Sequence, residues 1–396
     1  MKRRDFVRTM LWAPAALTCA GRVFAAPAES PRFLLVFLRG GYDCANVLVP
    51  YSSSYYYETR PNIAVPRPVA QESDGALILD SDWALAPALR ESIGPLYSQR
   101  QALFIPFAGT DDLSRSHFET QASIEFGQPL QGSRDLHSGF LARLAGVVNG
   151  AAPIAFTDSL PVCFRGSSDI PNISLKGLNK PVFDARQAAI LADMYAGHPL
   201  QKEVEDGLEL RQHMTRLMDQ ETQEASQNAI TAKGFELEAR RVGRMMREQY
   251  RIGFIDVGGW DTHINEGAAQ GQLATNSENL GKGLAALAQE LGAQWRNTVV
   301  AVVSEFGRTF RENGDKGTDH GHGSVYWILG GSVSGGRIAG RQTRVERAQL
   351  FQDRDYPVLN EYRSVLGGLF TTLWGLSTEQ LERVFPSSTP VDLGLV

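Results

Sequence analysis

Short apolar runs alternate with helical stretches along this chain. The β-rich runs are Phe33 to Leu38, Ala102 to Phe107, Pro153 to Phe156, Ile252 to Val257, Thr298 to Val303 and Val325 to Leu329. Several are hydrophobic without interruption, as strands buried on both faces of a parallel sheet must be. The pattern predicts an α/β fold, a three-layer α/β/α sandwich with a mostly parallel central sheet.

Two helical regions interrupt or connect these strands. One lies between the fourth and fifth runs, with Ser277 as its expected N-cap and an apolar face of Leu280, Leu284, Leu287 and Leu291. The other, a charge-laced stretch from about residue 185 to 250, carries Leu208, Met214, Leu217, Leu237 and Met245. Such spacing is more typical of core packing than of cofactor contacts. We therefore expect a single domain over residues 29–396, with a helical insertion at about 185–250.

The first 28 residues have the pattern of an export signal. Arg3 and Arg4 are followed by Phe6, a short apolar run and small residues near Ala25. This pattern is typical of the bacterial twin-arginine pathway, and the apolar run is shorter than the roughly twenty residues needed to span a bilayer. We expect a periplasmic protein, not an integral membrane protein, that contacts the twin-arginine translocase during export.

Charge and cysteine content narrow the function classes. The chain has a formal net charge of −5, and the export segment is itself basic, so the remainder is more acidic still. Nucleic-acid binding requires a basic face, so we expect no nucleic-acid partner. Cys44 and Cys163 are the cysteines outside the export segment. They allow one disulfide but neither a disulfide framework nor a thiolate zinc site.

Candidate metal ligands follow the predicted strands in glycine-rich turns. They are Asp43 after the first run, Asp261 and His263 after the fourth, and Asp319, His320 and His322 beyond the fifth. Parallel strands bring such loops together at their carboxyl ends. Carboxylate and imidazole together suit a divalent transition metal, whereas a single Asp-x-His is usually a hydrogen-bonded turn. Two such motifs favour a site for one or two ions, first zinc or manganese, with calcium or magnesium as alternatives.

A further polar loop follows the second strand and contains Ser114, Arg115, Ser116 and His117. It precedes a predicted helix, so Ser116 has the ordinary interpretation of an N-cap. Beside a metal, the same hydroxyl becomes a candidate nucleophile, with the helix amides available to an anion.

Together these motifs resemble a known family. Arg39-Gly40-Gly41-Tyr42-Asp43, Arg115-Ser116-His117-Phe118, Gly258-Gly259-Trp260-Asp261-Thr262-His263 and Gly317-Thr318-Asp319-His320-Gly321-His322-Gly323, preceded by Ser304 to Arg308, look like the bacterial family labelled domain of unknown function 1501. That family is similar to the alkaline phosphatase and sulfatase superfamily. The resemblance covers nearly all of the chain after the export segment.

The resemblance implies two ligand sets. In the first, Asp43, Asp319 and His320 hold one ion beside Ser116. In the second, Asp261 and His263 hold another, with His322 as third ligand, although the superfamily commonly takes that histidine from further downstream and this chain has none after His322.

Departures from the superfamily restrict the chemistry. The surroundings of Ser116 lack the proline and arginine of the motif that becomes formylglycine in sulfatases, and they match the alkaline phosphatase nucleophile poorly. The general mechanism remains, in which a metal activates Ser116 or water and an arginine neutralises charge. Among Arg39, Arg115 and Arg308 we favour Arg115 because it adjoins Ser116. Glu305 is expected to orient a ligand histidine.

These expectations favour a periplasmic metal-dependent hydrolase of phosphate or sulfate esters, acting on a small molecule or a cell-envelope component. The alternative is an exported metal-binding protein without hydrolytic activity, within an envelope or polymer-secretion complex. Phosphonate cleavage and phosphoryl mutation are other chemistries of the same fold.

Overall fold

A computed structural model describes residues 30–69, 75–132, 134–167, 170–175, 185–202, 204–208 and 234–396. The predicted export segment lies outside these residues, as do Met214 and Leu217 of the predicted insertion. No helix in the described ranges combines the length and apolar character needed to cross a membrane.

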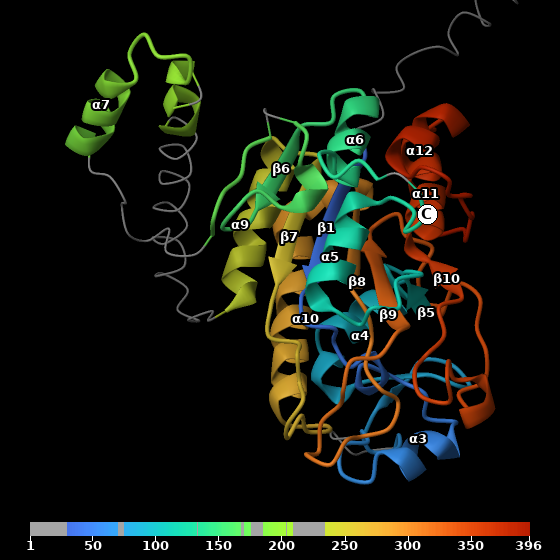
Figure 1. Cartoon of the computed structure of the whole chain (residues 1–396). Helices are drawn as coiled ribbons and strands as arrows, with labels where there is room; N and C mark the ends of the chain where they lie inside the picture. Colours follow the sequence, from blue (N-terminus) through green and yellow to red (C-terminus); the bar gives the residue numbers. More distant parts are fainter. Residues whose placement is uncertain are drawn as a thin grey trace, which may run out of the picture.

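A seven-stranded sheet forms the centre of the molecule (Figure 1). In sheet order the strands are β10 (Asn360–Glu361), β5 (Ala102–Gly109), β9 (Ser324–Gly330), β8 (Thr298–Ser304), β1 (Arg32–Leu38), β7 (Ile252–Val257) and β6 (Pro153–Phe156). All six apolar runs of the sequence are strands of this sheet. Strand β9 is antiparallel to both of its neighbours, and every other pairing is parallel. The predicted mostly parallel sheet is confirmed.

Helices pack on both faces of the sheet and bury a separate core on each. One core includes apolar residues of α4 (Ile93–Ser98), α9 (Phe235–Glu248) and α10 (Gln272–Leu291). The other includes residues of α5 (His117–Phe126), α6 (Phe140–Val147), α11 (Tyr362–Trp374) and α12 (Thr378–Val384). Two buried layers with a sheet between them make the predicted three-layer α/β/α sandwich (Figure 1).

The predicted start of α10 is wrong. The helix begins at Gln272 after Gly271, and Ser277 lies inside it, buried rather than capping. Its apolar face is as expected, with Leu280, Leu284, Leu287 and Leu291 all buried. The region of the predicted insertion contains α7 (Ala185–Met194) and α9, and Met245 of α9 is core.

A small second sheet accompanies the central sheet, and a short helix lies beyond the carboxyl end of β1 (Figure 1). The sheet is formed by β2 (Leu48–Val49), β4 (Ala84–Leu85) and β3 (Leu77–Ile78), and the helix is α3 (Ser54–Thr59). Cys44 lies in the core on this side of the central sheet and Cys163 in the core on the other. Both thiols are free.

Candidate metal centre

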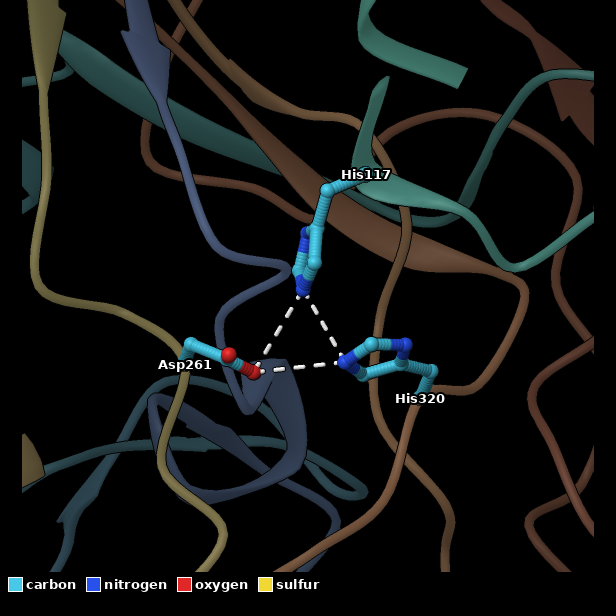
Figure 2. Close-up of side chains that lie close together, drawn as sticks. All are labelled: His117, Asp261 and His320. Atoms are coloured by element: carbon cyan, nitrogen blue, oxygen red, sulfur yellow. Dashed lines mark hydrogen bonds and ion pairs between the residues drawn. The ribbon is translucent and has the colours of Figure 1, made fainter. Parts of the chain in front are cut away.

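Three side chains from three distant segments converge beyond the carboxyl ends of β5, β7 and β8 (Figure 2). His117 opens α5, Asp261 follows β7, and His320 lies between β8 and β9. His117 Nε2 is 2.9 Å from His320 Nε2 and 3.5 Å from Asp261 Oδ1, and His320 Nε2 is 3.3 Å from the same oxygen. Two imidazoles and a carboxylate therefore face one common point.

Glu305 determines which nitrogen of His117 faces the centre. Its fully buried carboxylate accepts a hydrogen bond from His117 Nδ1 at 2.8 Å, which leaves Nε2 with a lone pair. Oε1 of Glu305 also accepts from Gln121 and from the backbone amide of Gly40. Burial raises the pKa of Glu305, but these hydrogen bonds outweigh it and keep the pKa below its usual value. The predicted orienting role of Glu305 fits this geometry.

The second histidine is oriented by the backbone. Nδ1 of His320 donates to the carbonyl of Arg115 at 3.0 Å, so its Nε2 also faces the centre as an acceptor. Arg115 adopts φ of 53°, in the left-handed region that such residues rarely occupy. Its guanidinium is fixed by Asp355, which is completely buried. The side chain of Arg115 thus holds its strained backbone in place, and its carbonyl orients His320, a candidate metal ligand.

Charge favours a cation between these acceptors. The pKa of His117 is raised, chiefly by its hydrogen bond to Glu305, whereas burial lowers the pKa of His320. Two Nε2 lone pairs and a carboxylate oxygen within 3.5 Å repel one another unless a positive charge lies among them. A proton on His117 or a metal ion supplies that charge.

Arg308 holds the carboxylate of Asp261 in place. Its buried guanidinium pairs with Oδ1 of Asp261 and also donates to the backbone carbonyls of Gly40 and Thr318. Burial raises the pKa of Asp261, but the hydrogen bond and charge of Arg308 bring it below its usual value. Arg308 thereby holds together three of the loops at the carboxyl end of the sheet.

His263 is a fourth candidate metal ligand, next to Asp261 and His320. Its Nε2 is 2.9 Å from Asp261 Oδ1 and 3.2 Å from His320 Nε2, while its Nδ1 lies 3.5 Å from Asp319 Oδ1. Asp319 therefore stands behind His263 and does not join the central group.

The donor set fits a divalent metal. Nitrogen and oxygen ligands about 2.0 to 2.2 Å from zinc lie about 2.9 to 3.5 Å from one another, and His117, Asp261 and His320 have this spacing. His263 has it toward Asp261 and His320. A mixture of imidazole and carboxylate suits zinc and manganese. His117, Asp261, His263 and His320 are the residues that would hold the ion; we call them the centre.

Besides Asp319, two further predicted ligands lie outside the centre. Asp43 is buried and its carboxylate pairs with the buried guanidinium of Arg60 through two nitrogens. Its pKa is lowered because the charge and hydrogen bonds of Arg60 outweigh the effect of burial. His322 is buried against the ring of Phe351, and burial lowers its pKa to about 4. The ligand grouping thus differs from both sets that the resemblance implied.

The candidate catalytic residues flank the centre. Ser116 is the N-cap of α5, where its side chain accepts from the amide of Glu119 at 3.4 Å, and it directly precedes His117. Ser114 Oγ lies 3.2 Å from Thr120 Oγ1. Because the guanidinium of Arg115 is engaged by Asp355, it is Arg308 whose charge reaches the centre.

His117 was not assigned a role from the sequence. It lies in a loop already noted for its polarity, but no Asp-x-His pattern marks it. The available signal was its position directly after a predicted helix cap and a buried strand, at the same edge as the other motifs.

The sequence as a whole matches one family. Residues 30–385 match the family described as "Protein of unknown function (DUF1501)". The chain belongs to this family. Among curated proteins, none matches the sequence.

Solved structures show distant likeness to this DUF1501 protein. A protein in the alkaline phosphatase superfamily from Vibrio parahaemolyticus is 10% identical, with a TM-score of 0.42, over 87% of this chain and 67% of that one. Ps i-CgsB in complex with k-i-k-neocarrahexaose is 10% identical, with a TM-score of 0.38, over 92% and 76%. The lipoteichoic acid synthase LtaP from Listeria monocytogenes is 10% identical, with a TM-score of 0.37, over 92% and 76%.

Proposed function

We propose that this DUF1501 protein is a metal-dependent hydrolase of phosphate or sulfate esters that works in the periplasm after twin-arginine export. The observation that carries the proposal is the convergence of His117, Asp261, His263 and His320, with the unprotonated nitrogens of His117 and His320 turned toward one point by Glu305 and Arg115. Elaborate orientation of ligands from three loops favours a functional ion.

Exposure of the ligands supports catalysis over a purely structural metal. Their side chains are between 22% and 47% exposed, so the centre opens to solvent. Structural metal sites are closed by protein ligands, whereas catalytic sites keep a position for water or substrate. An ester oxygen could therefore reach an ion held by these residues from the solvent side.

The protein groups around the centre suit hydrolysis of an anionic ester. A bound divalent ion would polarise an ester oxygen and lower the pKa of a nearby hydroxyl or water. Arg308 holds Asp261 and adds a positive charge below the centre. The N-terminus of α5, at Ser116 and His117, offers backbone amides to an anionic oxygen. Ser116 is the proposed nucleophile, since its hydroxyl is adjacent in sequence to His117 and is partly exposed, whereas the hydroxyl of Thr262, between Asp261 and His263, is buried against Glu266.

A second candidate is an exported metal-binding protein without hydrolytic activity. The observation in its favour is that Ser116 is engaged as a helix cap and Arg115 is tied to Asp355. Neither of the catalytic groups expected from the sequence is free of a structural contact. In that case the ion would serve stability or assembly.

An ester panel with metal control separates the two candidates. Protein purified without chelator should hydrolyse a phosphate or sulfate ester, lose activity on chelation and regain it with zinc or manganese. Ser116→Ala should lower turnover by at least about a hundredfold, or roughly 2.7 kcal/mol in barrier, with metal content retained. Ser114→Ala is the matched control and should cost much less. A fully metallated wild type that turns over no ester would favour the second candidate.

A further inference from the structure

Large apolar side chains stand exposed on the loops that carry the centre. Phe118 is 88% exposed, Ile264 61% and Leu113 53%. Phe118 directly follows His117 and Ile264 directly follows His263. The α-carbons of these two apolar residues are thus one peptide unit, about 3.8 Å, from those of two ligands. Leu113 lies in the loop that leads to Ser116.

This exposure is unusual for the element concerned. Phe118 is the most exposed large apolar side chain in the part of the chain that the structure describes, although it lies in the first turn of α5. Ile124 and Phe126 of the same helix are buried. Single exposed apolar residues need no explanation, but several around one polar site are typical of a binding site for an apolar group.

The chemistry of the centre limits what that group can be. We propose that the substrate is an amphiphilic ester, with its phosphate or sulfate head at the centre and its hydrocarbon chain against Phe118, Ile264 and Leu113. This inference rests on the proposed function. In the reaction the bond between phosphorus or sulfur and the bridging oxygen breaks. Water supplies the new hydroxyl on the head, and its proton goes to the departing alcohol.

The exposed side chains of Phe118, Ile264 and Leu113 are called the patch below. Acidic residues on the loops that carry the centre favour a single amphiphile over an anionic membrane surface as the partner of this patch. The side chains of Asp319 and Asp111, on the loops that carry the centre, are both more than half exposed. Acidic groups repel an anionic bilayer at long range, whereas one anionic head can be held by an ion at the centre together with Arg308. The patch therefore serves a chain attached to that head.

Binding of non-hydrolysable phosphonates tests the inference without turnover. Zinc-loaded protein should bind dodecylphosphonate, kept below its critical micelle concentration, at least tenfold more tightly than methylphosphonate. Full burial of one methylene strengthens binding by about fourfold, so partial burial of the chain suffices. Phe118→Ser or Ile264→Ser should remove most of this preference, leave methylphosphonate affinity unchanged and retain the metal. Val391→Ser, at an exposed apolar position on the C-terminal segment, should bind like wild type.

The outcomes distinguish the two proposals. Equal affinity for both phosphonates, with an ester hydrolysed, would overturn the amphiphile and leave the hydrolase standing. Absence of metal-dependent phosphonate binding together with absence of ester turnover would overturn both. Loss of binding to vesicles of anionic phospholipid in Phe118→Ser, with unchanged phosphonate preference, would assign the patch to a membrane surface and overturn the inference.

Discussion

His117 and Glu305 are joined by a 2.8 Å hydrogen bond between Nδ1 and a carboxylate oxygen that solvent does not reach. The bond crosses between the start of α5 and the end of β8, two segments that the sequence separates widely. The bond orients the imidazole and raises the pKa of His117. A more basic Nε2 is a better ligand for a metal cation.

Removing the charge of Glu305 should weaken metal binding. Glu305→Gln keeps an oxygen that can accept from His117 but lacks the negative charge, so we expect metal affinity to fall by about tenfold or more. Competition with a chelator measures this. Glu125→Gln is the control, because that buried carboxylate pairs with Arg39 and contacts no ligand of the centre. An unchanged dissociation constant in Glu305→Gln would exclude the orienting role.

Glu266 should stabilise two ligand loops at once. Its buried Oε2 accepts from the hydroxyls of Thr262 and Thr318 at 2.8 and 2.9 Å, and these residues lie within two positions of the ligands. Burial raises the pKa of Glu266 well above its usual value, and the amide oxygen of glutamine can accept the same two hydrogen bonds. Glu266→Gln should therefore fold with near wild-type stability. Glu266→Leu removes the acceptor that two buried hydroxyls share, and its free energy of unfolding, measured in urea, should fall by about 2 to 6 kcal/mol. Equal stability of the two variants would refute this role.

Acid should destabilise the fold through His322. Its pKa is about 4 in the folded protein against about 6.5 in the unfolded chain, so the unfolded state binds more protons between these values. Stability is then lost as pH falls from about 6.5 to about 4, by up to about 3 kcal/mol. His322→Asn should flatten this dependence when both proteins are unfolded in chelator, which separates the effect from metal release. Parallel pH profiles for the two proteins would contradict it.

Export should depend on the paired arginines. Arg3 and Arg4 are essential to a twin-arginine signal, so replacing both with lysine should leave the precursor uncleaved in the cytoplasm. Fractionation and immunoblotting of wild type and double variant give the readout. Normal processing of the double variant would remove the basis for a periplasmic location.

Much of the fold could be predicted because the buried strands of an α/β sheet appear in the sequence as apolar runs. All six runs are strands, and the segments that follow three of them, β5, β7 and β8, carry the centre. The start of α10 could not be read from a cap, since it begins after Gly271 without a side-chain cap while Ser277 is buried inside. A serine can occupy a buried position inside a helix as well as cap its N-terminus.

The grouping of ligands could not be predicted from loop position alone. Which loops meet depends on strand order: only β9 separates β5 from β8, and the loop with His117 reaches His320. Asp43 follows β1 as expected, but Arg60 pairs with it from only 17 residues away, and no periodic pattern announces that ion pair. The sequence motifs predicted that the site lies at the carboxyl edge of the sheet, but which residues lie together there depends on tertiary contacts.

Metal content of two histidine variants tests the central claim most directly. Wild type purified without chelator, and analysed by mass spectrometry of the elements, should carry a divalent ion. His117→Ala should lose it because a ligand is missing. His322→Asn should keep it, because that side chain lies against Phe351 away from the centre. Retention of the ion in His117→Ala together with its loss in His322→Asn would contradict this account and restore the ligand set implied by sequence resemblance.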